Sequence, residues 1–116
     1  INIMKSIRGA IAVVENNELS IVASSKTLIL SVMKENDIAE EDIIFALFTV
    51  THDLDQAFPA KAFRELGMHS IAAIDTVAPT IEDDLTGCIR LLLTINTNND
   101  VNHVYLNDAA TLRPDR

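Results

Sequence analysis

A continuous apolar segment at residues 88–95 constrains the fold of this chain more than any other feature. It reads Cys-Ile-Arg-Leu-Leu-Leu-Thr-Ile and contains neither glycine nor proline. A run of this length that is rich in aliphatic residues is typical of a strand covered on both faces of a sheet. Arg90 lies inside it. A guanidinium cannot lose its proton, so its burial is costly unless a negative or strongly hydrogen-bonding group meets it.

Two kinds of partner can satisfy Arg90. The segment offers no carboxylate beside it, so the partner is either an acid from a distant part of the chain or an anionic ligand. Simpler alternatives are a structural ion pair, or a guanidinium that extends past the end of the strand into water. The segment therefore predicts a buried strand and leaves the role of Arg90 open.

Charge and cysteine content limit the classes of partner. The net charge of −8 argues against non-specific binding to nucleic acid or to an anionic membrane surface. Cys88 is the single cysteine, which excludes an intramolecular disulfide framework and fits a reducing compartment. The sequence shows neither an apolar stretch of membrane-spanning length nor a signal-peptide pattern. We expect one domain over residues 1–116, soluble and cytoplasmic.

Hydrophobic periodicity predicts an α/β fold: a mixed five-stranded sheet with one long and one short helix. Asn17 is expected to cap the long helix, which runs to about Asn36. Pro59 fits the first turn of the short helix, over residues 58–66, and Gly67 is expected to end it. The predicted strands cover residues 3–14, 43–50, 70–75, 88–96 and 103–106. Gly9 within the first strand indicates a bulge or a close backbone approach.

The predicted elements cannot cover both faces of such a sheet. Two helices suffice for one face, whereas the central strands look apolar on both. The cheapest cover for the second face is another copy of the same chain. We therefore expect a homo-oligomer, in which binding sites can lie between subunits.

Arg8 and Tyr105 join Arg90 as candidate binding residues. Arg8 lies within the first predicted strand much as Arg90 lies within the fourth. Two arginines on strands of an acidic protein indicate a local positive pocket for a small anion, most simply a carboxylate held by a bidentate fork. Tyr105 is the only tyrosine and can add a hydroxyl donor, although a core aromatic with a satisfied hydroxyl is the simpler interpretation.

Other polar residues carry weaker signals. His52 and Asp53 are more typical of caps and turns than of a metal site. The run 82–84 is most simply a solvated loop, because contiguous acids do not face one point. Cys88 is expected to be a small core residue. The sequence contains no glycine-rich phosphate loop and no metal signature, so electrostatics around an anion is the chemistry that remains.

Five segments in order resemble a known family. They read S-I-R-G-A at 6–10, T-H-D-L-D-Q-A-F-P-A-K-A-x-R-E-L at 51–66, C-I-R at 88–90, H-V-Y-L at 103–106 and L-R-P-D at 112–115. Together they resemble the monofunctional, trimeric α/β type of bacterial chorismate mutase over essentially the entire chain. The resemblance implies a pseudo-α/β-barrel homotrimer with active sites between adjacent subunits. It also implies conversion of chorismate to prephenate, toward phenylalanine and tyrosine, without any cofactor.

The resemblance assigns roles to individual residues. Arg90 matches the cation that stabilises the ether oxygen, Arg8 matches the residue that holds a carboxylate, and Tyr105 matches a donor to the substrate. The positions that match the lining of the substrate cleft are Phe58, Ala60, Lys61, Arg64 and Ile74. Leu112 and Arg113 match the C-terminal segment that closes over the site.

One position departs from the family pattern. The usual active-site glutamate, which accepts a hydrogen bond from the substrate hydroxyl, falls on Ala78. Our hypothesis is that Asp75 supplies the missing carboxylate and orients Arg90. A local bend of the backbone would be needed, because positions 75 and 78 have opposite parity in a strand. A loop shift that brings in Glu82 is the alternative.

Ala78 also keeps two other functions open. One is a non-catalytic trimer that uses the same cleft to bind a carboxylate metabolite of the aromatic pathway. The other is an imine-deaminating or related small-carboxylate enzyme, because a related trimeric barrel hosts that chemistry and a fold does not fix a function. The segments around Arg90 and Tyr105 favour the mutase.

Overall fold

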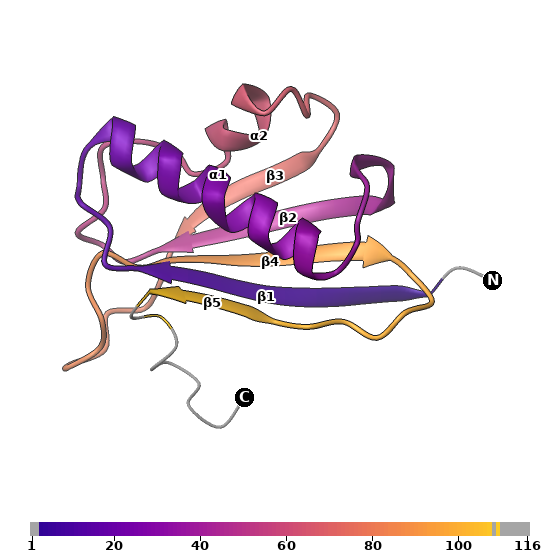
Figure 1. The fold of residues 1–116 in the computed structure, drawn as a ribbon. Coiled ribbons are helices and arrows are strands. Elements are labelled where there is room, and N and C mark those ends of the chain that lie inside the picture. The colour runs from indigo at the N-terminus through magenta and orange to yellow at the C-terminus, as the bar shows by residue number, and fades with distance from the viewer. Residues whose placement is uncertain (1–2, 108, 110–116) are drawn as a thin grey trace.

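The structure is a computed structural model that describes residues 3–107 and 109 of the 116-residue chain. Five strands and two α-helices follow one another in mixed order (Figure 1). Their bounds are β1 Met4–Ala12, α1 Glu18–Glu35, β2 Ile43–Val50, α2 Lys61–Glu65, β3 Ala72–Val77, β4 Ile89–Asn96 and β5 Val104–Asn107. A short 3-10 helix, Glu40–Asp42, precedes β2 and was not predicted.

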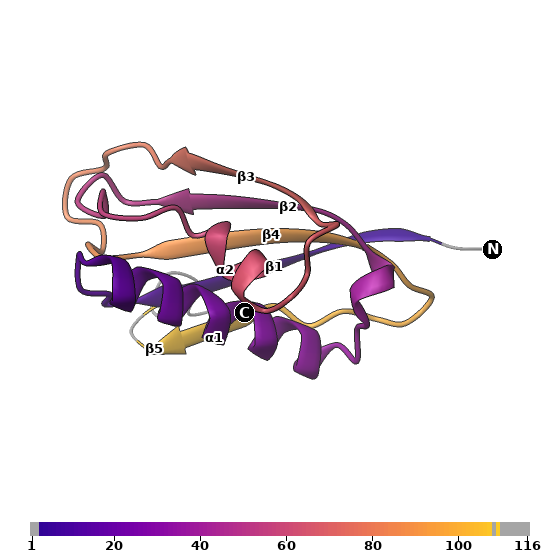
Figure 2. The same cartoon turned by 90° about the horizontal axis from the view of Figure 1, so that it is seen from above.

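The strands form one mixed sheet in the order β3-β2-β4-β1-β5 (Figure 2). β4 runs antiparallel to both of its neighbours, β1 and β2. The two outer pairs, β1 with β5 and β2 with β3, are parallel. The predicted mixed five-stranded sheet with one long and one short helix is confirmed.

Several predicted boundaries need correction. The first strand ends at Ala12, because the chain leaves the sheet and Val14 N–H then donates to the Gly87 carbonyl in a loop. The short helix begins only at Lys61, since Phe58 accepts the Lys61 N–H in a preceding turn. The third strand lies two residues later than predicted, at Ala72–Val77, where it pairs with β2.

The long helix α1 begins as the sequence predicts. Asn17 has an extended backbone, and its side-chain oxygen accepts the Ser20 N–H at 2.7 Å. Glu18 lies in the first turn, where a negative charge interacts favourably with the helix dipole. The Asn17 cap therefore fixes the point at which the chain turns from β1 into the helix.

Both helices pack on the same face of the sheet (Figures 1 and 2). Side chains from alternate strand positions form the core beneath them, as a two-residue period requires. These are Ile7 and Ile11 of β1, Phe48 and Val50 of β2, and Ile89, Leu91, Leu93 and Ile95 of β4. The helices leave the opposite face of the sheet uncovered, which we call the open face.

Gly9 allows α1 to approach β1 closely. A Cβ atom at this position would lie 2.9 Å from Val32 Cγ2 and 3.1 Å from Leu28 Cδ1, so the helix would have to shift. Of the two predicted roles for Gly9, the close approach is confirmed. Within residues 3–107 and 109, no helix combines the length and the apolarity needed to cross a bilayer.

Candidate functional site

The strand register brings three predicted site residues together on the open face. Ala10 of β1 pairs with Arg90 of β4 and with Tyr105 of β5, and paired residues of neighbouring strands point to the same face. Arg8 lies two residues before Ala10 and shares that face. Arg90 follows Ile89, which packs under the helices, so this is the face that the helices leave uncovered.

These residues line a cleft of about 460 Å³. This volume lies within the range of ~300–1,000 Å³ that is typical of small-molecule sites. Thr49 of β2 contributes to the floor, where it pairs with Arg90 in the antiparallel register. Ala78 and Asp84 line the end of the cleft and belong to the segment that connects β3 to β4.

Two buried polar atoms in this cleft have no hydrogen-bond partner among the described residues. They are Nε of Arg8 and the hydroxyl of Tyr105. An unpaired buried donor carries a desolvation penalty of ~1–3 kcal/mol, so a site that presents two of them is suited to a ligand with matching acceptors. Together with the Arg90 guanidinium, these donors suit the cleft to an anionic ligand with several oxygen acceptors.

Arg90 is paired within the chain. Its Nη2 lies 3.4 Å from Oδ2 of Asp84, and the side chains of both residues are about one-third exposed. The other Asp84 oxygen, Oδ1, accepts the Leu85 N–H at 2.8 Å. Of the alternatives considered for Arg90, a carboxylate from outside its own strand is therefore present, and it faces the cleft together with the guanidinium.

Ala78 cannot supply a polar group to this cleft. Its side chain is buried at the cleft wall, and its N–H donates to the carbonyl of Val50 at 2.8 Å. The carboxylate that belongs to this end of the cleft is therefore that of Asp84, not one at position 78.

The other predicted site residues gather in a second hollow, beside α2. A pocket of about 300 Å³ is lined by Phe58, Ala60, Lys61, Arg64 and Asp75 among others. Oδ1 of Asp75 accepts the Ala60 N–H at 2.9 Å. Burial raises the pKa of the Asp75 carboxyl, and this hydrogen bond only partly offsets the effect. Phe58 is 72% exposed, although it is a large apolar residue.

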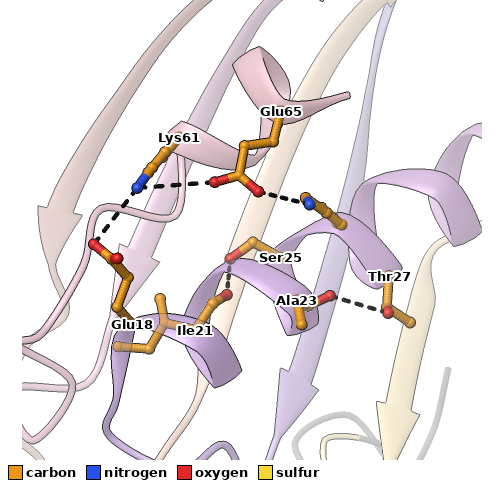
Figure 3. A network of polar contacts seen from close by, with 8 residues as sticks. Glu18, Ile21, Ala23, Ser25, Thr27, Lys61 and Glu65 are labelled. Atoms are coloured by element: carbon orange, nitrogen blue, oxygen red, sulfur yellow. Dashed lines mark hydrogen bonds and ion pairs between the residues drawn. The ribbon is translucent and has the colours of Figure 1, made fainter. Parts of the chain in front are cut away.

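Lys61 is held by acidic residues of both helices (Figure 3). Its Nζ lies 3.5 Å from Glu18 of α1 and 3.8 Å from Glu65 of α2. Glu65 also pairs with Lys26 of α1 at 2.6 Å, and this contact lowers the pKa of the Glu65 carboxyl. The network fixes α2 on α1 and so positions Lys61 at the rim of the second pocket.

Asp75 does not contact Arg90 of its own chain. Asp75 pairs with Phe48, which points under the helices, so Asp75 lies on the helix-covered face and Arg90 on the open face. The pairing of β2 with β3 is continuous from Ala72 to Val77, without the bend that our hypothesis needed. Within one chain, Asp75 therefore does not orient Arg90, and the role of Asp75 in an assembled site stays a prediction.

The remaining predicted residues fall outside both pockets or outside the described part of the chain. Ile74 is 63% exposed on β3, with the parity opposite to that of Asp75. Leu112 and Arg113 lie outside the described residues. Glu82, the alternative source of a carboxylate, is exposed.

The weaker candidates have structural surroundings. Asp53 acts as a turn residue, because its Oδ2 accepts the Gly87 N–H at 2.9 Å. Cys88 is buried, and burial raises the pKa of its thiol, as expected for a core residue. In the described part of the chain, no group of three or more His, Cys, Asp or Glu residues is placed to hold a metal ion.

Asp84 is the residue that sequence reasoning missed. The acidic run 82–84 was predicted to be a solvated loop, and this holds for Glu82 and Asp83, which are exposed. Asp84 instead turns back toward the sheet. Gly87, which adopts a left-handed conformation (φ +60°), marks a turn before β4, but the sequence carries no signal that separates Asp84 from its acidic neighbours.

Three comparisons with known proteins agree with one another. The chain matches the family described as chorismate mutase type I over residues 4–116. It is 38% identical to chorismate mutase AroH of Thermus thermophilus, covering 97% of this chain and 95% of that protein. It is 35% identical to chorismate mutase AroH of Bacillus subtilis (strain 168), covering 97% and 91%. A solved chorismate mutase from Clostridium thermocellum superposes with a TM-score of 0.89 at 40% identity, covering 92% of this chain and 98% of that one.

Proposed function

The chain belongs to the chorismate mutase type I family, and from this membership and the geometry of the open-face cleft we infer that it converts chorismate to prephenate, with Arg90 as the principal catalytic residue. The observation that carries the role of Arg90 is its position beside Arg8 and Tyr105, on one face of one sheet. Relatives that share 35–40% identity over nearly the full chain are chorismate mutases, so a non-catalytic binder and an imine-deaminating enzyme are not favoured.

The reaction requires few chemical groups. It is an intramolecular pericyclic rearrangement, so no protein nucleophile takes part. The cleft must hold the dianionic substrate in its compact, reactive conformer, which is an effect of orientation. As the ether C–O bond breaks, negative charge develops on its oxygen. A cation fixed at that oxygen then stabilises the transition state more than the ground state.

Arg90 is the residue placed for that stabilisation. It projects into the cleft from the start of β4, the central strand of the sheet, and a guanidinium keeps its charge at any working pH. Arg8 lies on the neighbouring strand β1 and is suited to bind a substrate carboxylate. Tyr105, one strand further along on β5, can donate its hydroxyl to the same ligand.

We propose that each active site is completed by a second copy of the chain in a homotrimer. In one chain, the sheet separates the open-face cleft from the pocket that contains Lys61, Arg64 and Asp75. These two half-sites can meet only if the α2 pocket of one copy faces the cleft of the next. Large apolar residues on and around the edge strand β3 are exposed and available for such contact: Phe58 72%, Ile74 63%, Val77 66% and Ile81 62%.

In this arrangement Asp75 keeps a functional role, but across the subunit boundary. We expect its carboxylate to accept the hydrogen bond of the substrate hydroxyl from the neighbouring copy. Asp75 is partly buried and has no cationic partner among the described residues, which is consistent with a carboxylate that accepts a hydrogen bond from a ligand. Sedimentation of the protein as a species of three chain masses would support this arrangement. Cytoplasmic location stays a prediction.

The first experiment compares wild-type protein with Arg90→Ala by the loss of chorismate absorbance. We expect turnover by the wild type and a loss of at least ~10²–10³-fold in kcat/KM for the variant, because a preorganised donor to the developing negative charge is removed. Circular dichroism should show that the variant is folded. Arg90→Lys, which keeps the charge but loses the planar fork, should fall between the two.

Wild-type protein that binds prephenate without converting chorismate would support the binding protein instead. Turnover of an imino acid in place of chorismate would support the deaminating enzyme. Equal turnover by the wild type and Arg90→Ala would refute the role given to Arg90 while leaving the activity intact.

A further inference from the structure

We propose that Asp84 is a positioning residue for Arg90: it holds the guanidinium in the orientation from which its remaining donors face the substrate. This inference rests on the proposed mutase function and deepens it. The direct observation is the 3.4 Å contact between Oδ2 of Asp84 and Nη2 of Arg90 at the end of the cleft.

The Asp84 carboxylate is held by hydrogen bonds within its own loop, independently of its contact with Arg90. Its second oxygen, Oδ1, accepts the Leu85 N–H at 2.8 Å, and the Asp84 N–H donates to the Ile81 carbonyl at 3.3 Å. Both bonds lie within the loop itself. The loop therefore orients the carboxylate, and the carboxylate in turn restricts the long, flexible arginine side chain.

The base of this loop is attached firmly to the sheet. Gly87 donates to Asp53 at 2.9 Å and accepts from Val14 at 2.8 Å, and Cys88 N–H donates to Thr51 Oγ1 at 3.0 Å. A Cβ atom at Gly87 would lie 2.6 Å from the Val14 carbonyl oxygen, so the backbone is tightly packed at this point. The loop leaves the sheet on the side away from the helices (Figure 1), which is the side of the cleft.

Asp84 differs from the acids next to it. Its side chain is 29% exposed and contacts Arg90, whereas Glu82 and Asp83 are exposed. The contact involves one terminal nitrogen of a guanidinium that carries five N–H donors, so several donors remain for a ligand. Asp84 thus positions Arg90 without blocking it.

The two effects of this carboxylate on catalysis have opposite signs. By fixing Arg90 it favours the transition state, and a misplacement of about 1 Å in such a group can cost ~10²-fold in rate. By placing a negative charge near the cleft it disfavours binding of a dianion. Removal of the charge should therefore lower kcat while KM stays the same or falls. Because a loss of folded protein would also lower the apparent kcat at unchanged KM, the folded fraction of each variant must be measured by circular dichroism.

The test compares Asp84→Asn with Asp83→Asn in the full chain. Both variants remove one negative charge from the same loop. Asp83 has a left-handed backbone (φ +65°), which asparagine tolerates well, and it is exposed, so its variant is the matched control. We expect Asp84→Asn to lower kcat about 10-fold or more, with KM equal or lower, and Asp83→Asn to match the wild type.

The Arg90→Lys background tests whether Asp84 acts through Arg90. Lysine lacks the guanidinium fork, so Asp84→Asn should lower kcat much less there than in the wild type, the coupling expected of two residues in one interaction. A loss of the same size in both backgrounds would overturn the proposal, as would equal effects of the Asp83 and Asp84 variants, or a change in KM alone. Wild-type protein without mutase activity would overturn the proposed function itself, whatever the variants do.

Discussion

The helix-covered face and the open face of the sheet are built from the same strands but treat their polar groups in opposite ways. On the helix-covered face the polar side chains have partners: Ser25 donates to the Ile21 carbonyl at 2.7 Å, and Asp75 accepts the Ala60 N–H at 2.9 Å. On the open face, Nε of Arg8 and the hydroxyl of Tyr105 are buried without a partner among the described residues.

This difference separates stability from function along each strand. In β4, the residues on either side of Arg90 pack under the helices, while Arg90 itself points into the cleft. Apolar burial on the helix-covered face stabilises the fold. The open face can therefore hold unsatisfied donors, because their cost is offset by that burial. Substitutions on the helix-covered face should therefore change mainly stability, whereas substitutions on the open face should change mainly the kinetic constants.

The largest effect on stability is expected from Leu93→Ala. Leu93 is fully buried in β4 under the helices, and truncation leaves a cavity that should cost about 2–5 kcal/mol of unfolding free energy. At a temperature where the variant stays folded, kcat and KM should be those of the wild type. Urea denaturation and steady-state kinetics measure the two quantities, and a raised KM would show that the two faces are not independent.

A smaller effect, with the opposite sign for stability, is expected from Tyr105→Phe. The hydroxyl is buried without a protein partner, so its removal should raise the unfolding free energy by about 1 kcal/mol. The loss of a donor to the substrate should raise KM roughly 2- to 10-fold. Thermal melting would measure the change in stability, and steady-state kinetics with chorismate would measure the change in KM. A destabilised variant would contradict this prediction, because it would mean that the hydroxyl is satisfied in the assembled protein.

The smallest effect is expected from Asp75→Asn, and it depends on pH. Burial raises the folded-state pKa of this carboxyl above its unfolded value of ~3.9. The folded state therefore holds the proton more tightly, and stability is lost as pH rises from about 3.9 through the folded pKa. Asparagine removes that loss and can still accept the Ala60 N–H.

Melting temperatures of this variant and the wild type should be compared at pH 7 and near pH 3.5. Asp75→Asn should be slightly more stable at pH 7 and should lose its advantage near pH 3.5. A difference that grows toward low pH would mean that the carboxylate is stabilised by an undetected cation. Reduced turnover at pH 7, despite greater stability, would support the role of Asp75 as an acceptor for substrate.

The sequence predicts the elements with a clear hydrophobic period better than those without. The strand at Ile43–Val50 and the helix after Asn17 lie where they were expected, because one is a continuous apolar run and the other has a cap. β3 reads Ala-Ala-Ile-Asp-Thr-Val, and its period is weak. Its position is set by pairing with β2 rather than by its own residues, so local reasoning misplaced it by two residues.

The sequence predicted most residues of the candidate site, but not that they are divided between the open-face cleft and the pocket beside α2. Arg8, Arg90 and Tyr105 were recognised as a group, and the register places them on one face. The face of Asp75 could not be predicted, because it depends on whether the β2–β3 pairing is interrupted. Asp84 could not be distinguished from Asp83 by composition. The two acids differ in the structure: Asp83 has a left-handed backbone and is exposed, whereas Asp84 contacts Arg90.

The alternation of β4 between core and cleft also bears on insertions and deletions. One residue gained or lost between Gly87 and Arg90 would exchange the two sets of side chains, so that the guanidinium would enter the core and an isoleucine or leucine would enter the cleft. Exchange of one aliphatic residue for another is far milder. We therefore expect the length of this strand to be inherited more strictly than most of its individual side chains, with changes in length confined to the connections at residues 97–103.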